Sequence, residues 1–162
     1  MKPHISLIGL GNILMQDEGV GVHAVKAILK DYALPPNLNV VDGGTAGLDL
    51  LPFIEGRDRV LFVDAVNFRQ EPGYIGVLRN QEIPVFFSAK HSLHHIGLAD
   101  VLAAAQLLNL LPPEVCLIGL QPHTIALGLE LTPLIQARLQ PLIARIIEEL
   151  QDWGLSLTPN PG

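Results

Sequence analysis

Acidic residues and a histidine stand at three places where an apolar run of the sequence has just ended. Asp17 and Glu18 follow the glycine turn of "GLGNILMQDEGVG", and Asp64 lies near the end of "RVLFVDAV". His94 belongs to "SAKHSLHHIG", between an apolar run and the next helical pattern. Two carboxylates and one imidazole could hold Zn, Ni or Mn and leave coordination positions open. Glu18, Asp64 and His94 are therefore a candidate metal or acid–base site.

Each of these residues also has a plain structural interpretation. Asp17 could cap the helix that follows it, and Glu18 would suit the positive end of the dipole of that helix. Asp64 could be a turn residue at the end of a strand, and the histidine-rich segment could be a polar loop. The more specific HExxH metal motif is absent from the sequence. The candidate site therefore depends on the fold bringing the three side chains to one edge.

The glycine turn also invites comparison with a dinucleotide-binding turn. That motif reads G-x-G-x-x-G, and here Gly9 and Gly11 are followed by Leu14 where the third glycine is needed. Asp17 and Glu18 would repel a pyrophosphate at the helix N-terminus, which normally attracts anions. There is no G-x-S-x-G nucleophile motif either. A nucleotide site is the weaker interpretation.

Short apolar runs alternate with helical patterns along the chain. Strands are expected at 5–10, 38–42, 59–66, 73–79 and 114–122, and helices at 19–32, 46–54, 97–110 and 133–153. Thr132 is the expected N-cap of the last helix. This alternation predicts the α/β class, as a three-layer sandwich with a central, mostly parallel sheet and helices on both faces. We expect one domain over 1–154 and a loosely ordered tail over 155–162.

In such folds, ligands bind beyond the carboxyl ends of the strands. Asp17 and Glu18 follow the first predicted strand, Asp64 lies near the end of the third, and Asp42, in the turn "DGGT", lies at the end of the second. Asp42 could take part in chemistry at this edge, or it could simply help to form the turn.

Composition limits the partners and the compartment. The net charge of -6, from 16 acidic and 10 basic residues, argues against nucleic acid or an anionic membrane as partner. Charged residues are 16% of the chain, below the usual share of about 25%, which indicates apolar surface offered to a partner or a well-buried sheet. The one cysteine, Cys116, allows no internal disulfide and fits the reducing cytoplasm. The apolar stretches are too short to span a bilayer.

Four segments in this order resemble the hydrogenase maturation proteases. They are "GLGNILMQDEGVG", "DGGTAGLDLL", "FVDAV" and "HSLHHIGLADVL", and the resemblance runs from about Ile5 to Leu150. It implies an endopeptidase that trims the C-terminus of the [NiFe]-hydrogenase large-subunit precursor. The metal ligands of that family fall here on Glu18, Asp64 and His94.

The same resemblance implies that the metal is nickel carried by the substrate. The precursor would arrive with nickel inserted, and the protease would recognise the ion through its three ligands; zinc or cadmium could take its place in a crystal. The cutting step stays open between metal-assisted attack and a carboxylate acting as general base, with Asp42 as candidate. A second hypothesis is a non-catalytic protein that binds the precursor and checks its metal, and a dinucleotide-binding protein is the weakest one.

Overall fold

Five apolar runs of the sequence form one central sheet. The strands are β1 (Ile5–Leu10), β3 (Leu38–Gly44), β4 (Arg59–Ala65), β5 (Ile75–Arg79) and β6 (Glu114–Leu120), in the spatial order β3-β1-β4-β6-β5. β3, β1, β4 and β6 run parallel, and β5 pairs antiparallel with β6. The computed structural model describes residues 2–88 and 97–161.

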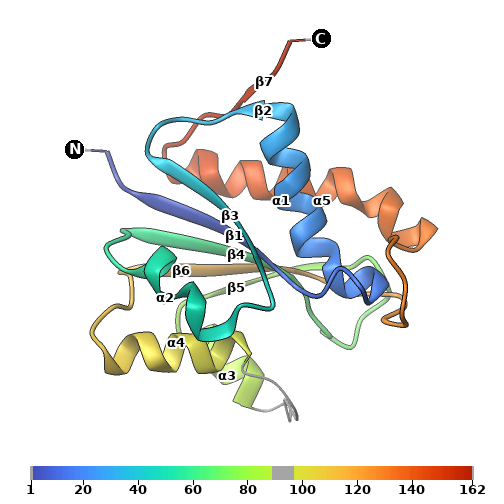
Figure 1. Cartoon of the computed structure of the whole chain (residues 1–162), viewed down its shortest axis with the longest axis horizontal. Coiled ribbons are helices and arrows are strands. Elements are labelled where there is room, and N and C mark those ends of the chain that lie inside the picture. Colours follow the sequence, from blue (N-terminus) through green and yellow to red (C-terminus); the bar gives the residue numbers. More distant parts are fainter. Residues whose placement is uncertain (1, 89–96, 162) are drawn as a thin grey trace.

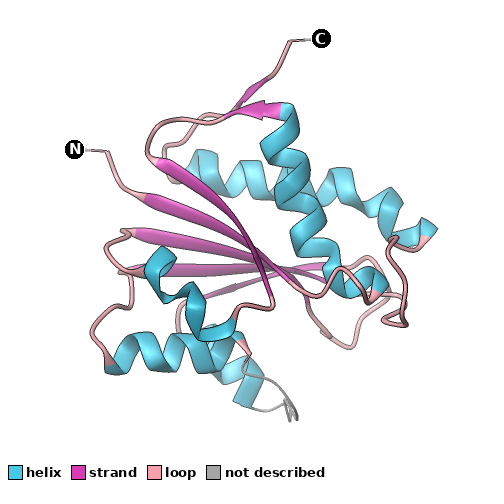
Figure 2. Ribbon diagram, in the orientation of Figure 1, coloured by secondary structure: helices cyan, strands magenta, loops and turns pink. Residues whose placement is uncertain are grey.

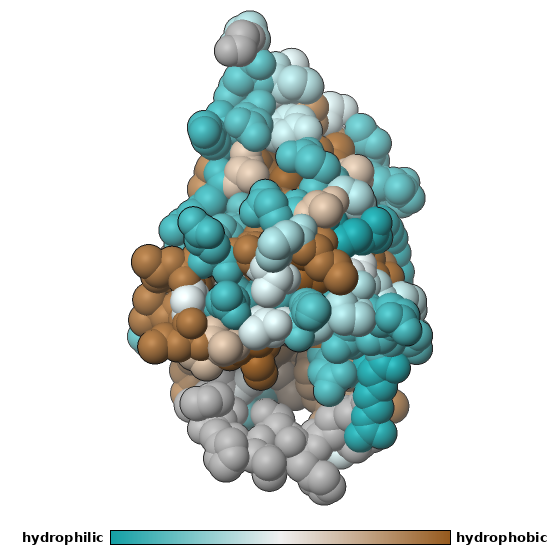
Figure 3. All heavy atoms as spheres, turned by 90° about the vertical axis from the view of Figure 1, so that its right-hand side faces the viewer, coloured by the Kyte–Doolittle hydropathy of each residue, from teal (hydrophilic) through white to brown (hydrophobic). Residues whose placement is uncertain are grey.

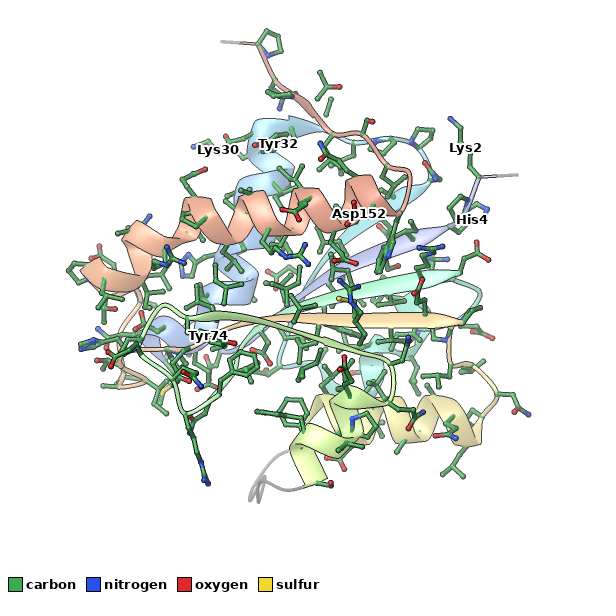
Figure 4. All side chains as sticks on the ribbon, turned by 180° about the vertical axis from the view of Figure 1, so that it is seen from behind. Lys2, His4, Lys30, Tyr32, Tyr74 and Asp152 are labelled. Atoms are coloured by element: carbon green, nitrogen blue, oxygen red, sulfur yellow. The ribbon has the colours of Figure 1, made fainter. Side chains whose placement is uncertain are left out.

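Helices cover both faces of this sheet (Figures 1 and 2). Residues of α1 (Val20–Asp31) and α5 (Pro133–Asp152) join the core on one face. Residues of α2 (Leu51–Ile54), α3 (Glu82–Ser88) and α4 (Leu98–Leu107) join the core on the other. Figure 4 shows the molecule from behind, with Asp152 at the end of α5 and Tyr32 just beyond the end of α1. The predicted α/β sandwich is confirmed.

Burial on both faces explains why the strands read as continuous apolar runs. Every residue of β1 is buried, and its side chains alternate between the two cores. Ile5 and Leu7 pack with α1 and α5, while Ile8 and Leu10 pack with α2 and α4. A sheet of this kind needs few charges, which accounts for part of the low charged fraction.

Two parts of the structure differ from what the sequence predicted. α3 was not expected, because "EIPVFFS" contains Pro84; the proline lies in the first turn of the helix, where its missing N–H costs nothing. The tail is also less loose than expected, since Leu155 and Leu157 are buried in the core. Beyond them β7 (Thr158–Pro159) pairs antiparallel with β2 (Tyr32–Ala33).

No helix within residues 2–88 and 97–161 is long and apolar enough to cross a bilayer.

Candidate active site

A cleft of about 810 Å³ lies beyond the carboxyl ends of β1, β3 and β4. Its walls are short segments that follow the strands, and they comprise residues 10–12, 44–50, 64–65 and 97–98 together with Glu18 and Val101. Glu18 comes from the 3₁₀ turn η1 (Gln16–Gly19) that leads into α1, and Asp64 comes from the end of β4. Two of the three predicted ligands therefore line one cleft.

Close packing of α1 on the sheet brings Glu18 to this position. A Cβ atom on Gly21, in the first turn of α1, would overlap the carbonyl oxygen of Val63 on β4. A Cβ atom on Gly9 of β1 would in turn overlap the carbonyl oxygen of Gly21. The two glycines let helix and strands approach more closely than any side chain would permit, and this places the start of α1 beside the end of β4.

Gly11 makes the turn between β1 and the acidic residues. Its φ of 121° favours glycine, and a Cβ there would overlap the carbonyl oxygen of Glu18. The same Cβ position lies 3.4 Å from Asp64 Oδ1. The glycine turn thus allows the backbone to pass between the two acidic residues, where a phosphate-binding turn would instead present its N–H groups to an anion.

The Asp64 carboxyl has unusual electrostatics. Burial against the strand ends raises the pKa of Asp64 to about 7, and the nearby negative charge of Glu18 raises this pKa as well. The backbone N–H of Ala65 donates to Asp64 Oδ1 at 2.8 Å and acts in the opposite direction. A cation placed between the two carboxylates would favour the ionised form of both, so the pair is suited to receive positive charge.

Asp17 has a different role from the helix cap predicted for it. It is fully buried, and its carboxylate accepts hydrogen bonds from the backbone N–H groups of His123, Thr124 and Thr132 at 2.8–3.1 Å. The hydroxyl of Thr132 also donates to it, at 2.8 Å. The capping interpretation of Asp17 is therefore wrong, because Asp17 does not cap its own helix. Thr132 is the N-cap residue of α5, as predicted, although its side chain makes no cap hydrogen bond. Asp17 instead holds the 123–132 loop.

Asp42, the candidate base, lies at the edge of the sheet. Its side chain is 43% exposed and its Oδ2 is 3.7 Å from Lys26 Nζ of α1. It is not among the described residues that line the cleft, whereas Asp49, which sequence reasoning passed over, is. The only signal for Asp49 was its place in "AGLDLL", directly after the glycines of the turn. The catalytic role of Asp42 stays a prediction.

His94 lies outside the described residues, as do His91 and His95. Gly97, three positions after His94, lines the cleft. Within residues 2–88 and 97–161, no group of three or more histidine, cysteine, aspartate or glutamate side chains is placed to hold a metal ion. The described part of the site therefore consists of the Glu18–Asp64 pair, and the third ligand stays a prediction.

Comparison with known proteins identifies the family. Residues 22–149 match the profile of the family described as Hydrogenase maturation protease. The chain belongs to the hydrogenase maturation protease family. It is a peptide hydrolase, and the resemblance seen in the sequence is confirmed.

Individual family members match over nearly the whole chain. The Hydrogenase expression/formation protein HupD of Rhodobacter capsulatus is 40% identical over 160 residues, which cover 97% of this chain and 76% of that protein. The Hydrogenase 2 maturation protease of Escherichia coli K12 is 36% identical over 156 residues, which cover 96% of this chain and 95% of that protein. The solved structure of the hydrogenase maturating endopeptidase HybD from E. coli superposes with a TM-score of 0.90 at 36% identity. The superposition covers 99% of this chain and 98% of that structure. The fold of this chain is therefore that of the solved endopeptidase over nearly its whole length.

Proposed function

We propose that this hydrogenase maturation protease removes the C-terminal extension of the [NiFe]-hydrogenase large-subunit precursor after nickel has been inserted. The observation that carries the proposal is the Glu18–Asp64 pair in an open cleft at the strand ends. The wall of the same cleft continues to Gly97, three residues beyond His94. We place the reaction in the cytoplasm because the single cysteine, Cys116, fits a reducing compartment.

Nickel is here part of the substrate. Glu18, Asp64 and His94 would supply two oxygens and one nitrogen to an ion that the precursor already holds through its own ligands. Imidazole and carboxylate suit a borderline divalent ion with open coordination positions. The raised pKa of Asp64 supports this role, because a carboxyl that is costly to ionise alone gains most from an arriving cation. The protease thereby distinguishes a loaded precursor from an empty one.

The cleft suits an extended peptide better than a small molecule. It is bordered by Gly44, Gly47 and small side chains such as Thr45 and Ala46, which leave the peptide backbone room to approach. Nickel could polarise the scissile carbonyl, or a carboxylate could accept a proton from the attacking water. Asp42 is our candidate for that base.

Single substitutions at Glu18, at His94 and at the two histidines near His94 test the proposal. Glu18→Gln and His94→Ala should abolish trimming of the nickel-loaded precursor, measured as the mass of the large subunit. His91→Ala and His95→Ala are the matched controls and should process it nearly normally. If His94 acts as a metal ligand and not as a packed core residue, His94→Ala should change stability by no more than about 0.5 kcal/mol, so the variant should melt close to the wild type. Full processing by the His94 variant would overturn the ligand assignment.

A further inference from the structure

Two neighbouring segments together expose six large apolar side chains. One is the turn after β1 and the other is the loop between β6 and α5, together with the first turn of α5. We call these side chains the apolar platform; they are Ile13 (36% exposed), Leu14 (51%), Ile125 (54%), Leu127 (82%), Leu129 (67%) and Leu134 (41%). Figure 3 shows hydrophobic side chains gathered along one edge of the face where α5 begins. Clusters of this kind mark interaction sites.

The backbone beneath the platform is fixed by hydrogen bonds between the two segments. Gly128 N–H donates to the Leu14 carbonyl at 2.8 Å, and Gln16 N–H donates to the Gly128 carbonyl at 2.9 Å. The buried Asp17 carboxylate fastens the same loop from below. Leu131, between the exposed leucines and α5, is buried in the core. The exposed side chains therefore stand on a preorganised backbone, which lowers the entropy lost when a partner binds.

The platform adjoins the cleft along the chain. Asn12 lines the cleft, and the chain passes from it directly to Ile13 and Leu14 of the platform. At the other end of the same turn, the platform anchor Asp17 precedes the candidate ligand Glu18. A protein that placed its C-terminal tail in the cleft would meet the platform with the surface next to that tail.

We propose that the apolar platform is the docking surface for the folded body of the large-subunit precursor, an inference that rests on the proposed function. A second copy of this chain fits less well, because it would cover the surface directly beside Asn12 of the cleft wall, where a protein substrate has to approach. An anionic membrane does not fit either, since residues 11–19 and 123–134 contain no lysine or arginine. The occupant is therefore a protein with a complementary apolar surface close to its C-terminal tail.

The experiment compares two double variants in which the substituted leucines are similarly exposed to solvent. Leu127→Ser with Leu129→Ser removes the most exposed part of the platform. Leu107→Ser with Leu108→Ser is the control, because Leu107, the last residue of α4, and Leu108, its C-cap, are 85% and 58% exposed. Figure 1 shows that α4 lies on the other side of the sheet from α5. With nickel-loaded precursor, the platform variant should raise KM about tenfold and leave kcat at saturation unchanged, as expected for loss of central apolar contacts. The control should match the wild type in both.

A binding measurement separates this inference from the proposed function. Nickel-free precursor should bind the immobilised wild-type protein through the platform, and the platform variant should weaken that binding about tenfold. If the wild type fails to cut loaded precursor, the proposed function is wrong. If it cuts but the platform variant keeps wild-type KM and binding, the docking surface is wrong. Sedimentation of a dimer that only the platform substitutions dissociate, with unchanged processing, would likewise overturn it in favour of a second copy.

Discussion

The carboxylate of Asp17 accepts two hydrogen bonds from Thr132, one from its backbone N–H and one from its hydroxyl, each 2.8 Å long. This contact joins the segment that carries Glu18 to the start of α5. The candidate metal ligand and the apolar platform are consequently fixed to the same buried group, and a change at Asp17 must affect both.

Replacement of Asp17 by alanine should therefore be strongly destabilising. It removes the acceptor of three backbone N–H groups and one hydroxyl, and leaves those donors in a buried region. We expect a loss of about 3 kcal/mol or more in the free energy of unfolding, measured by chemical denaturation. Asp49→Ala, at an exposed carboxylate of the cleft wall, should change it by no more than about 0.5 kcal/mol. Equal stability of the two variants would show that Asp17 does not hold the loop.

Substitution of Gly21 by alanine tests the close packing of α1 on the sheet. In an isolated helix this change would be stabilising by about 1 kcal/mol, because alanine is the better helix former. Here the added Cβ would overlap the Val63 carbonyl, so α1 must shift away from β4. We expect a net loss of about 1–3 kcal/mol in thermal or chemical denaturation, together with impaired trimming. A stabilised, fully active variant would contradict the packing described here.

The raised pKa of Asp64 predicts a pH-dependent effect of Asp64→Asn on the metal-free protein. The pKa of the Asp64 carboxyl is about 7 in the folded protein and near 4 in the unfolded chain. The protonated carboxyl therefore stabilises the folded wild type below pH 4, and this contribution is lost as the pH rises to 7. Asparagine does not titrate. In EDTA the variant should therefore gain thermal stability relative to wild type between pH 4 and pH 8, although it should not trim precursor. Asp42→Asn, at a more exposed carboxylate, is the control; a similar gain there would contradict the prediction.

The contribution of Glu149 to stability should change with pH in the opposite direction to that of Asp64. Its side chain is 2% exposed, with Oε1 2.7 Å from Arg79 Nη2 and 3.0 Å from Arg145 Nη2. The hydrogen bonds from Arg79 hold the pKa of Glu149 below its usual range, so its contribution to stability is present at neutral pH and is lost as the pH falls into the acid range. Glu149→Gln should cost about 3 kcal/mol at pH 7 in chemical denaturation, with less difference in acid. Glu148→Gln, at a side chain that is 66% exposed, should leave the free energy of unfolding nearly unchanged. An equally large loss of stability in that variant would contradict a special contribution of the buried Glu149 carboxylate.

Local signals were enough to predict the sheet and the two acidic residues, Glu18 and Asp64, that line the cleft. β1 and β4 are continuous apolar runs, and Glu18 and Asp64 follow them closely in the sequence. The rule that parallel strands present their carboxyl ends at one edge then brings the two acids together. Gly9 and Gly11 marked the turn that makes this possible.

Contacts between distant parts of the chain could not be read from the sequence. The partners of Asp17 lie 106 to 115 residues away, and its position at the start of a helix suggested a cap instead. Leu155 and Leu157 looked like a tail because proline and glycine follow them, yet their alternation places both in the core. α3 was missed because Pro84 reads as a helix breaker unless the helix start is known.

The central claim is that this protease reads nickel held by its substrate, and one comparison tests it most directly. Purified wild-type protein is incubated with nickel-loaded and with nickel-free large-subunit precursor, and the mass of the large subunit is followed by intact-protein mass spectrometry. We predict that the loaded precursor loses its C-terminal extension while the nickel-free precursor keeps its full mass. Trimming of both precursors at the same rate would contradict recognition of nickel through Glu18, Asp64 and His94, and trimming of neither would contradict the proposed function itself.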